Sequence, residues 1–334
     1  MEESSKKLMK DIGERNFLSQ ISHLVDINAL DFNDDASAFE LPSGDLLVLN
    51  VDMLIYKKDV LPGMDFKQVG KKAVTMAVSD IIAKGVKPLG CLVSVGFPAE
   101  TEVKKAKDIL FGVKEKCINY NTLFLGGDLN ESSDIIVDVV AFGLSRGKKI
   151  IPRKGAEKGD LIFSSGSFGF TSLGFKILLE DFSVPDEIEK LALLSVYEPK
   201  AVLDFLQLLE KLPIKICMDS SDGLLVTLSE LSKINNLGID IINVPLDNAI
   251  SDFTAISGLN PLDLAFNGGE EFELIFAISP DKKSELLKVA EKLDLSLHHI
   301  GIFNDKHDEI VIIDSMYKKY DLPQDGFEHF KGDN

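Results

Sequence analysis

Asp80 is the residue that most restricts how this chain can fold. It lies in a predicted helix over residues 65–84. Its neighbours along that helix are almost all apolar: Met76, Ala77, Val78, Ile81, Ile82 and Ala83. Because an unpaired carboxylate in apolar surroundings costs several kcal/mol, the fold must bring Asp80 a partner. That partner can be structural, as in a helix N-cap or a buried salt bridge, or it can be a metal ion shared with other acids.

Other acidic residues recur where a predicted strand ends or a turn begins. One acidic turn is ordinary, because Asp and Gly suit the backbone of turns. Repetition along one chain is harder to explain in this way, since α/β folds collect their ligands at the carboxyl ends of strands. The acids concerned are Asp34, Asp35, Asp52, Asp128, Asp219, Asp222, Glu270 and Glu271.

These acids have no histidine or cysteine at metal-ligand spacing, so their donors are oxygen atoms. Oxygen donors favour Mg²⁺, Mn²⁺ or Ca²⁺ over zinc or copper. Mg²⁺ typically keeps waters and takes one or two carboxylates plus phosphate oxygens, so scattered aspartates suit a polyphosphate site. Glycines beside the acids would let the backbone approach phosphate oxygens closely. The chemistry suggested is phosphoryl transfer, in which alignment and charge neutralisation supply most of the catalysis.

The charge balance argues against a nucleic-acid-binding surface. The chain has 36 Lys plus Arg and 54 Asp plus Glu, which gives a formal net charge of −18. Proteins that bind nucleic acids need clustered Lys and Arg to displace phosphate counterions. A nucleotide substrate is still compatible with this balance if Mg²⁺ or backbone amides meet its phosphate charge.

Several other classes of site and location are excluded. The cysteines Cys91, Cys117 and Cys217 lie far apart, which predicts reduced, buried thiols rather than disulfides or a zinc site. No segment approaches the roughly 18 apolar residues of a membrane span, and the N-terminus lacks the apolar core of a signal peptide. We therefore expect a cytoplasmic protein that does not bind membranes.

Familiar catalytic motifs are missing or misplaced. The run Gly143-Leu-Ser145-Arg-Gly147 fits the G-x-S-x-G nucleophile elbow, but an elbow must lead from a strand directly into a helix. Here a lysine-rich segment with a proline follows, so a hairpin or linker turn is expected. Neither G-x-x-x-x-G-K-[ST] nor G-x-G-x-x-G occurs, which leaves P-loop and Rossmann sites without support.

Predicted strands and helices alternate along the chain, which indicates an α/β or α+β fold. In the first half we expect helices over 65–84 and 100–119 and strands over 45–52, 89–95, 122–125 and 134–143. A stretch rich in Gly and Lys, 146–159, then reads as a connection between domains. Further strands alternate with helices beyond it. We place two domains at residues 1–147 and 148–334, in keeping with the chain length.

The ordered motifs resemble those of thiamine-monophosphate kinases, in the superfamily that includes aminoimidazole ribonucleotide (AIR) synthetase. Each motif alone is weak, but eight in the family's order along nearly the whole chain are specific. The segments at 33–36, 51–54, 78–85 and 126–128 resemble G-D-D-A, T-D-T-L, N-L-S-D-x-A-A-M-G and the first three residues of G-G-D-T. Those at 153–160, 219–224, 268–274 and 326–330 resemble R-x-G-A-x-x-G-D, D-x-S-D-G-L, G-G-E-D-Y-E-L and G-Y-D-H-F.

The resemblance implies a two-domain PurM-like fold. Its N-terminal domain is a mixed sheet packed on helices that forms a homodimer, and its C-terminal domain is an α/β sandwich. The implied activity is ATP-dependent phosphorylation of thiamine monophosphate to thiamine diphosphate, by direct in-line transfer with several Mg²⁺ ions. The implied metal ligands are Asp35, Asp52, Asp80, Asp128, Asp219 and Asp222, of which Asp80, Asp128 and Asp222 are also the expected catalytic residues. Gly127, Arg153 and Ser221 would contact ATP, and Asp59, Glu270 and Phe327 would contact thiamine monophosphate.

The chain also departs from the family's pattern. Asn33 replaces a glycine, and Val51, Met53 and Leu129 replace threonines. A substrate-contacting histidine expected shortly after Asp52 is absent, and Asp59 is the candidate for its place. Two alternatives therefore stay open. One is an AIR synthetase-like, ATP-dependent enzyme for another small phosphorylated substrate, and the other is a non-catalytic nucleotide-binding regulator of the same fold.

Overall fold

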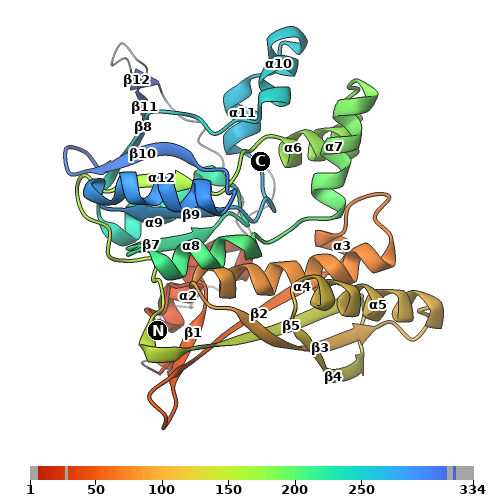
Figure 1. Cartoon of the computed structure of the whole chain (residues 1–334). Helices are drawn as coiled ribbons and strands as arrows, with labels where there is room; N and C mark the ends of the chain where they lie inside the picture. Colours follow the sequence, from red (N-terminus) through yellow and green to blue (C-terminus); the bar gives the residue numbers. More distant parts are fainter. Residues whose placement is uncertain (1–6, 27–28, 314–318, 321–334) are drawn as a thin grey trace, which may run out of the picture.

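The computed structural model describes residues 7–26, 29–313 and 319–320. Over these residues the chain forms two α/β units, each built on one sheet, and the second unit packs against the helices of the first (Figure 1). The expected α/β class and two-unit architecture are confirmed.

The first unit is a five-stranded sheet with the order β1-β2-β5-β3-β4. The strands are β1 (Ser37–Glu40), β2 (Leu46–Ile55), β3 (Pro88–Phe97), β4 (Leu123–Glu131) and β5 (Ile136–Ser145). Strands β3 and β4 are parallel while the other pairs are antiparallel, so the sheet is mixed as expected. Helices α4 (Phe66–Ala83) and α5 (Val103–Asn119) cover one of its faces.

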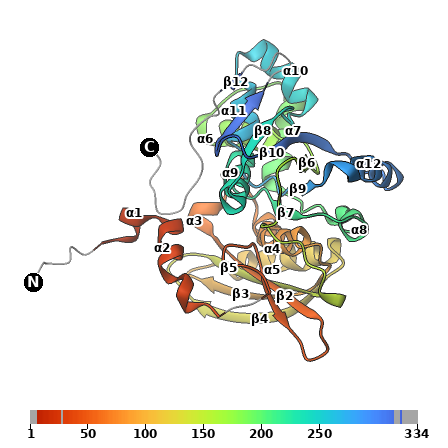
Figure 2. The ribbon, with the colours of Figure 1, turned by 90° about the vertical axis from the view of Figure 1, so that its left-hand side faces the viewer.

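Short helical segments complete the first unit. They are α1 (Met9–Ile12), α2 (Glu14–Ile21), the 3-10 turns η1 (Ser22–Leu24) and η2 (Arg146–Lys148), and α3 (Tyr56–Asp59). Figure 2 shows α1 and α2 at one side of the sheet, away from α4 and α5.

The sequence predicts that Asp128 follows a strand over 122–125, in a turn, and this prediction is wrong. Strand β4 runs on to Glu131 and carries the Gly126-Gly127-Asp128 sequence within its pairing to β3. The physical reason lies at Gly127, whose φ is 157° and where a Cβ would lie 1.9 Å from the carbonyl oxygen of Val93. Only glycine allows the two backbones to approach this closely, so the glycine extends the strand here rather than ending it.

The second unit is a seven-stranded sheet with the order β12-β11-β8-β10-β6-β9-β7. Its strands are β6 (Leu161–Ser164), β7 (Ile216–Asp219), β8 (Gly238–Ile241), β9 (Leu274–Ile278), β10 (His298–Asn304), β11 (Ile310–Ile313) and β12 (Lys319–Tyr320). Its helices are α6 (Phe170–Glu180), α7 (Asp186–Tyr197), α8 (Leu206–Lys211), α9 (Leu224–Asn235), α10 (Asn248–Ser257), α11 (Pro261–Phe266) and α12 (Lys283–Lys292), with 3-10 turns η3 (Leu203–Phe205) and η4 (Pro280–Lys282).

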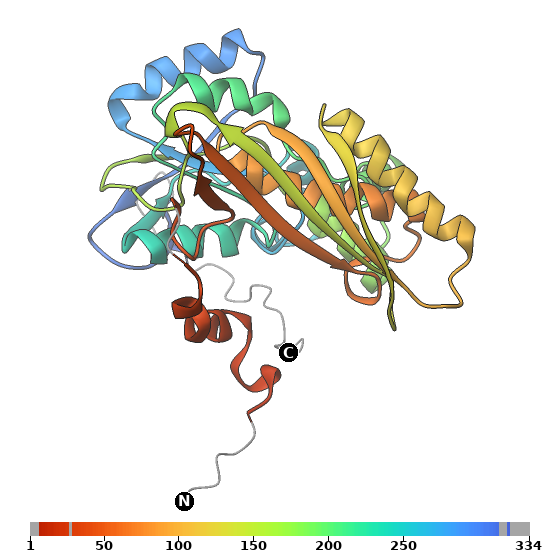
Figure 3. The same ribbon diagram turned by 90° about the horizontal axis from the view of Figure 1, so that it is seen from below.

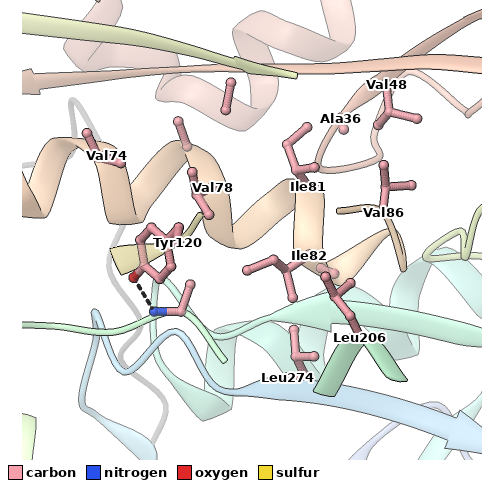
Figure 4. Packing of buried hydrophobic residues seen from close by; sticks show 14 of the residues in the cluster. Ala36, Val48, Val74, Val78, Ile81, Ile82, Val86, Tyr120, Leu206 and Leu274 are labelled. Atoms are coloured by element: carbon pink, nitrogen blue, oxygen red, sulfur yellow. Dashed lines mark hydrogen bonds between the residues drawn. The ribbon is translucent and has the colours of Figure 1, made fainter. Parts of the chain in front are cut away.

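Helix α4 lies between the two units and supplies much of their common core. It begins with a capping box, in which Asp65 accepts a hydrogen bond from the backbone of Gln68 and the side chain of Gln68 accepts one from the backbone of Asp65. Its apolar side chains are buried on the sheet side and on the side of the second unit. Figure 4 shows Ile82 of α4 beside Leu206 and Leu274, which belong to the second unit. Packing on both sides accounts for the nearly continuous apolar sequence of this helix.

The other face of the first sheet is not covered by any element that the structure describes (Figure 3). Residues on this face alternate with buried residues along β2, as the period of a strand requires. Val51, Val140 and Leu92 pair in register across β2, β5 and β3, and 58% of Val51 and 43% of Leu92 are exposed. Leu125 on β4 is 52% exposed. The result is an exposed apolar sheet face.

Three smaller expectations can be compared with the structure. The cysteines are free and buried, as predicted.

Ser145 ends β5, and its hydroxyl donates a hydrogen bond to the carbonyl oxygen of Lys149 in the turn that follows. The prediction that the segment 143–147 leads into a turn is confirmed. Among the described residues, no helix is long and apolar enough to span a bilayer.

Candidate active site

A cleft of about 560 Å³ lies between the two units. One wall comes from β2, the segment after it and α4, and the other comes from α6 and from the turns that follow β7 and α11. Seven of the predicted site residues line it: Asp52, Asp59, Asp80, Asp219, Ser221, Asp222 and Glu270. Residues far apart in the sequence are therefore gathered at one place by the packing of the two units.

Three carboxylates form a compact cluster at one end of this region. Asp35, Asp80 and Asp219 each offer an oxygen, and these atoms all lie within 4.8 Å of one another. Asp219 ends β7, is 1% exposed, and has no hydrogen-bond partner for either carboxylate oxygen among the described residues. Since a buried carboxylate needs a counter-charge or hydrogen bonds, its oxygens are available to a cation.

Asp52 joins the cluster through Asn50, which the sequence analysis missed. The Asn50 amide donates to Asp52 at 2.7 Å and to Asp80 at 2.5 Å. Asn50 and Asp52 are two residues apart on β2 and so lie on the same sheet face, the one toward α4. This alternation is the signal from which Asn50 could have been found.

The carboxylates of the cluster repel one another, and a cation would relieve this repulsion. Burial raises the pKa of Asp80 well above its usual range, and the nearby charges of Asp219 and Asp52 raise it further. Burial also raises the pKa of Asp52, although hydrogen bonds with Asp80 and Asn50 oppose the rise. Close carboxylates in a desolvated site resist ionisation together, and a divalent cation relieves that repulsion. An oxygen-only donor set of this kind fits Mg²⁺.

The turns after β7 and α11 are locked together beside the cluster. The backbone amide of Glu270 donates to the carbonyl of Ser221 at 2.6 Å, and that of Phe272 donates to the carbonyl of Ser220 at 3.0 Å. Gly223 has a φ of 93°, and a Cβ there would lie 2.2 Å from the carbonyl oxygen of Gly268. Gly223 is thus required for the two turns to pack against each other.

At the other end of the cleft, a buried lysine connects two predicted substrate residues. Lys72 of α4 is 1% exposed, and its ammonium contacts the Glu270 carboxylate at 2.5 Å and donates to the Asp59 carbonyl at 2.5 Å. The Asp59 carboxylate accepts a hydrogen bond from the backbone of Ile55 at 2.6 Å. Lys72 was also missed, because a lysine within an apolar helix gives no sign of which distant acid it will meet.

Arg153 is held by acids rather than open to the cleft. Its guanidinium pairs with Asp35 and, at 3.4 Å, with Glu230, and it donates to the carbonyl of Asn33 at 3.0 Å. Burial lowers the pKa of Arg153, while the charge of Glu230 opposes this. Arg153 lines a separate small cavity with Asp34 and Lys154.

The structure does not bring Asp128 and Gly127 to the cluster. Asp128 is exposed on β4, at the edge of the sheet, and pairs in register with Ser94, which pairs in turn with Asp138 and Met53. This row of residues alternates with the buried ones and so belongs to the exposed sheet face. The cluster lies on the opposite face. Phe327 falls outside the described residues.

Comparison with known proteins agrees with this architecture. Residues 33–145 match the family model of the AIR synthase related protein, N-terminal domain, and residues 157–314 match that of the C-terminal domain. A thiamine-monophosphate kinase of Nitrosopumilus maritimus is 33% identical over 299 residues, which cover 90% of this chain and 93% of the relative.

Solved structures give the same relationship. A crystal structure from Thermus thermophilus superposes with a TM-score of 0.83 at 27% identity, and covers 92% of this chain and 98% of its own. AaThiL complexed with AMPPCP and TMP has a TM-score of 0.83 at 26% identity, with coverage of 98% and 99%. With two matched domains, a relative above 30% identity and this shared fold, the chain belongs to the thiamine-monophosphate kinase family and is a phosphotransferase.

Proposed function

We propose that this protein transfers the γ-phosphate of ATP to the phosphate of thiamine monophosphate, producing thiamine diphosphate. The observation that carries the proposal is the cleft in which an acid cluster and the predicted substrate residues Asp59 and Glu270 lie together. A relative of similar fold was solved with both AMPPCP and TMP, so that protein accommodates a nucleotide analogue and TMP together.

Mg²⁺ fits the donor set, and Asp80, Asp219 and Asp52 are the residues that would hold it. When bound, it would neutralise phosphate charge and align the phosphates for attack. The unpartnered oxygens of Asp219 support this assignment. Asp222 lies at the same wall, where burial raises its pKa to about 6 and Arg15 opposes the rise.

The remaining residues position the reactants. Lys72 holds the Glu270 carboxylate through an ion pair, and the backbone amide of Ile55 holds the Asp59 carboxylate through a hydrogen bond. Lys72 also donates to the Asp59 carbonyl, so the substrate end of the cleft has defined polar walls. The attacking atom is a phosphate oxygen that is already ionised near neutral pH, so no general base is required. We propose direct in-line transfer, without a phosphorylated form of the protein.

We further propose that two copies associate through the exposed apolar sheet face of the first unit. Large exposed apolar patches on a protein surface mark interaction sites. Asp128 and Gly127 lie on or beside this face, away from the cluster of their own chain. A contribution of these two residues to an ATP site would therefore depend on the association of two copies. We also propose that the first domain comprises residues 1–147 and the second residues 148–334.

The kinase assignment is tested by ADP release in a coupled assay with ATP, Mg²⁺ and thiamine monophosphate. We expect turnover that requires all three components, with no covalent phosphate on the protein. Asp80→Asn keeps the shape of the side chain but removes its charge, and we expect it to lower turnover by roughly 10³-fold while the protein stays folded.

The matched control is Asp294→Asn, at an exposed position with a φ of 55° that Asn tolerates well. It should retain full activity. Tight ATP binding without any turnover in the parent protein would contradict the kinase assignment and favour a regulator. Normal activity in Asp80→Asn would contradict the shared-metal role.

A further inference from the structure

Lys84 places a positive charge inside the acidic region. It follows the last residue of α4, and its side chain is fully buried. Its ammonium lies 2.5 Å from an oxygen of Asp34 and 2.7 Å from an oxygen of Asp35, and it donates to the carbonyl of Cys217 at 3.1 Å. Two of these contacts are hydrogen bonds, to Asp34 and to the carbonyl of Cys217, and the contact with Asp35 is an ion pair.

The two ends of the acid cluster are consequently different. At the Asp35 end, one carboxylate oxygen contacts Lys84 and the other contacts Arg153. No hydrogen bond is made to the carboxylate oxygens of either Asp35 or Asp219 among the described residues, but Asp35 has these two ion pairs and Asp219 has none there, while Asp80 accepts a hydrogen bond from the amide of Asn50. The direct ion pairs that Lys84 and Arg153 make within this cluster are therefore with Asp34 and Asp35.

We propose that Lys84 acts as a built-in cation that takes the place of one divalent ion. Its ammonium neutralises the Asp34 and Asp35 end of the cluster, and divalent ions bind at the Asp80 and Asp219 end. This inference rests on the metal site of the proposed function. A buried, hydrogen-bonded ammonium between two carboxylates would have to be displaced before a metal could bind there, and leaving it buried without partners would be costly.

The experiment counts Mn²⁺ ions bound per chain, by electron paramagnetic resonance of free Mn²⁺ and by calorimetry, without nucleotide. Lys84→Met removes the charge and keeps an unbranched side chain that is one atom shorter. We expect it to bind one more Mn²⁺ per chain than the parent, whereas Lys84→Arg binds the parent number. Lys215→Met is the matched control, because it removes a lysine from a different acidic pair, Glu157 and Asp160, and should bind the parent number.

A second variant keeps the test decisive if Lys84→Met does not fold. Asp34→Asn alters a residue that, in this proposal, contacts the lysine and not a metal. We expect its Mn²⁺ count to equal that of the parent, whereas Asp219→Asn weakens Mn²⁺ binding by about tenfold or more. Equal Mn²⁺ counts in Lys84→Met and parent, or loss of a Mn²⁺ ion in Asp34→Asn, would overturn the role of Lys84.

The outcomes separate this inference from the kinase assignment. Turnover is measured separately, by ADP release with ATP, Mg²⁺ and thiamine monophosphate, and the Mn²⁺ count is measured without nucleotide. A parent protein that turns over but binds the same number of ions as Lys84→Met contradicts only the inference. A parent protein that binds no Mn²⁺ in any form contradicts the inference and the metal part of the proposed function together.

Discussion

Lys72 and Asp80 are charged residues of the same helix, the first buried and the second partly buried, and they are neutralised in different ways. Lys72 meets a carboxylate of the other unit, Glu270, and a backbone carbonyl, so the chain satisfies it by itself. Asp80 lies among other acids, and burial together with their charges raises its pKa. The requirement for a partner is visible in the sequence for Asp80, but which kind of partner it has depends on what packs beside it.

Glu273 provides a test of this electrostatic reasoning outside the cleft. Burial raises its pKa to about 7, and a hydrogen bond from the hydroxyl of Ser165 opposes the rise. A carboxyl whose pKa is raised on folding stabilises the protein while it is protonated, and that stabilisation is lost as pH rises from about 4.5 through 7. Glu273→Gln cannot ionise and should escape this loss.

We therefore expect the stability of Glu273→Gln relative to the parent to be greater at pH 8 than at pH 5, by about 2–3 kcal/mol. Denaturant unfolding of both proteins at the two pH values measures the difference. Because other titrating groups are common to both proteins, their effects cancel in the comparison. A gap that is the same at both pH values, or larger at pH 5, would show that Glu273 is ionised in the folded protein.

At the scale of elements, the contact between α4 and α5 decides where the site residues of α4 lie. Gly70 of α4 and Gly112 of α5 allow the two backbones to approach each other. A Cβ on Gly70 would lie 2.0 Å from the carbonyl oxygen of Ile109, and one on Gly112 would lie 1.9 Å from that of Lys67. Since backbone atoms cannot move aside locally, any larger residue must push the helices apart.

Gly70→Ala should consequently destabilise the protein by about 1–3 kcal/mol, even though Ala favours a helix over Gly by about 1 kcal/mol. Thermal and denaturant unfolding measure the loss. Lys107→Ala, on the exposed side of α5, is the control and should change stability by less than about 0.5 kcal/mol. A Gly70→Ala protein as stable as the parent would mean that the helices do not pack this closely.

Elements also differ in how much of them the sequence predicts. The bounds of α4 agree with the predicted helix over 65–84 to within a residue, because its capping box is a local signal. The extent of β4 was underestimated, because the two glycines at 126 and 127 suggest a turn locally. Their use in a strand depends on β3, which lies alongside.

At the scale of the whole molecule, the exposed apolar face of the first sheet predicts self-association. A double variant, Val51→Glu with Leu92→Glu, places two charges on this face, on strands that both pair with β5. We expect the parent to be a dimer and the variant to be largely monomeric in analytical ultracentrifugation, since burying unpaired charge in an interface is costly.

Ile256→Glu is the control, because Ile256 is 82% exposed, the most of any large apolar residue in the described part of the chain, and lies on α10 of the second unit. It should leave the dimer intact. A monomeric parent, or a double variant that remains dimeric, would contradict association through the sheet face.

The sequence by itself determined the succession of strands and helices, the oxygen-rich character of the site and the family to which its motifs belong. These follow from local periodicity, from turn and capping residues, and from donor chemistry. Only the tertiary structure decided which acids meet. It brings Asp35, Asp80 and Asp219 together, leaves Asp128 on the other sheet face, and gives Lys72 and Lys84 their partners. The physical reason is that a buried charge is stabilised by groups from distant elements, and their positions depend on how the two units pack.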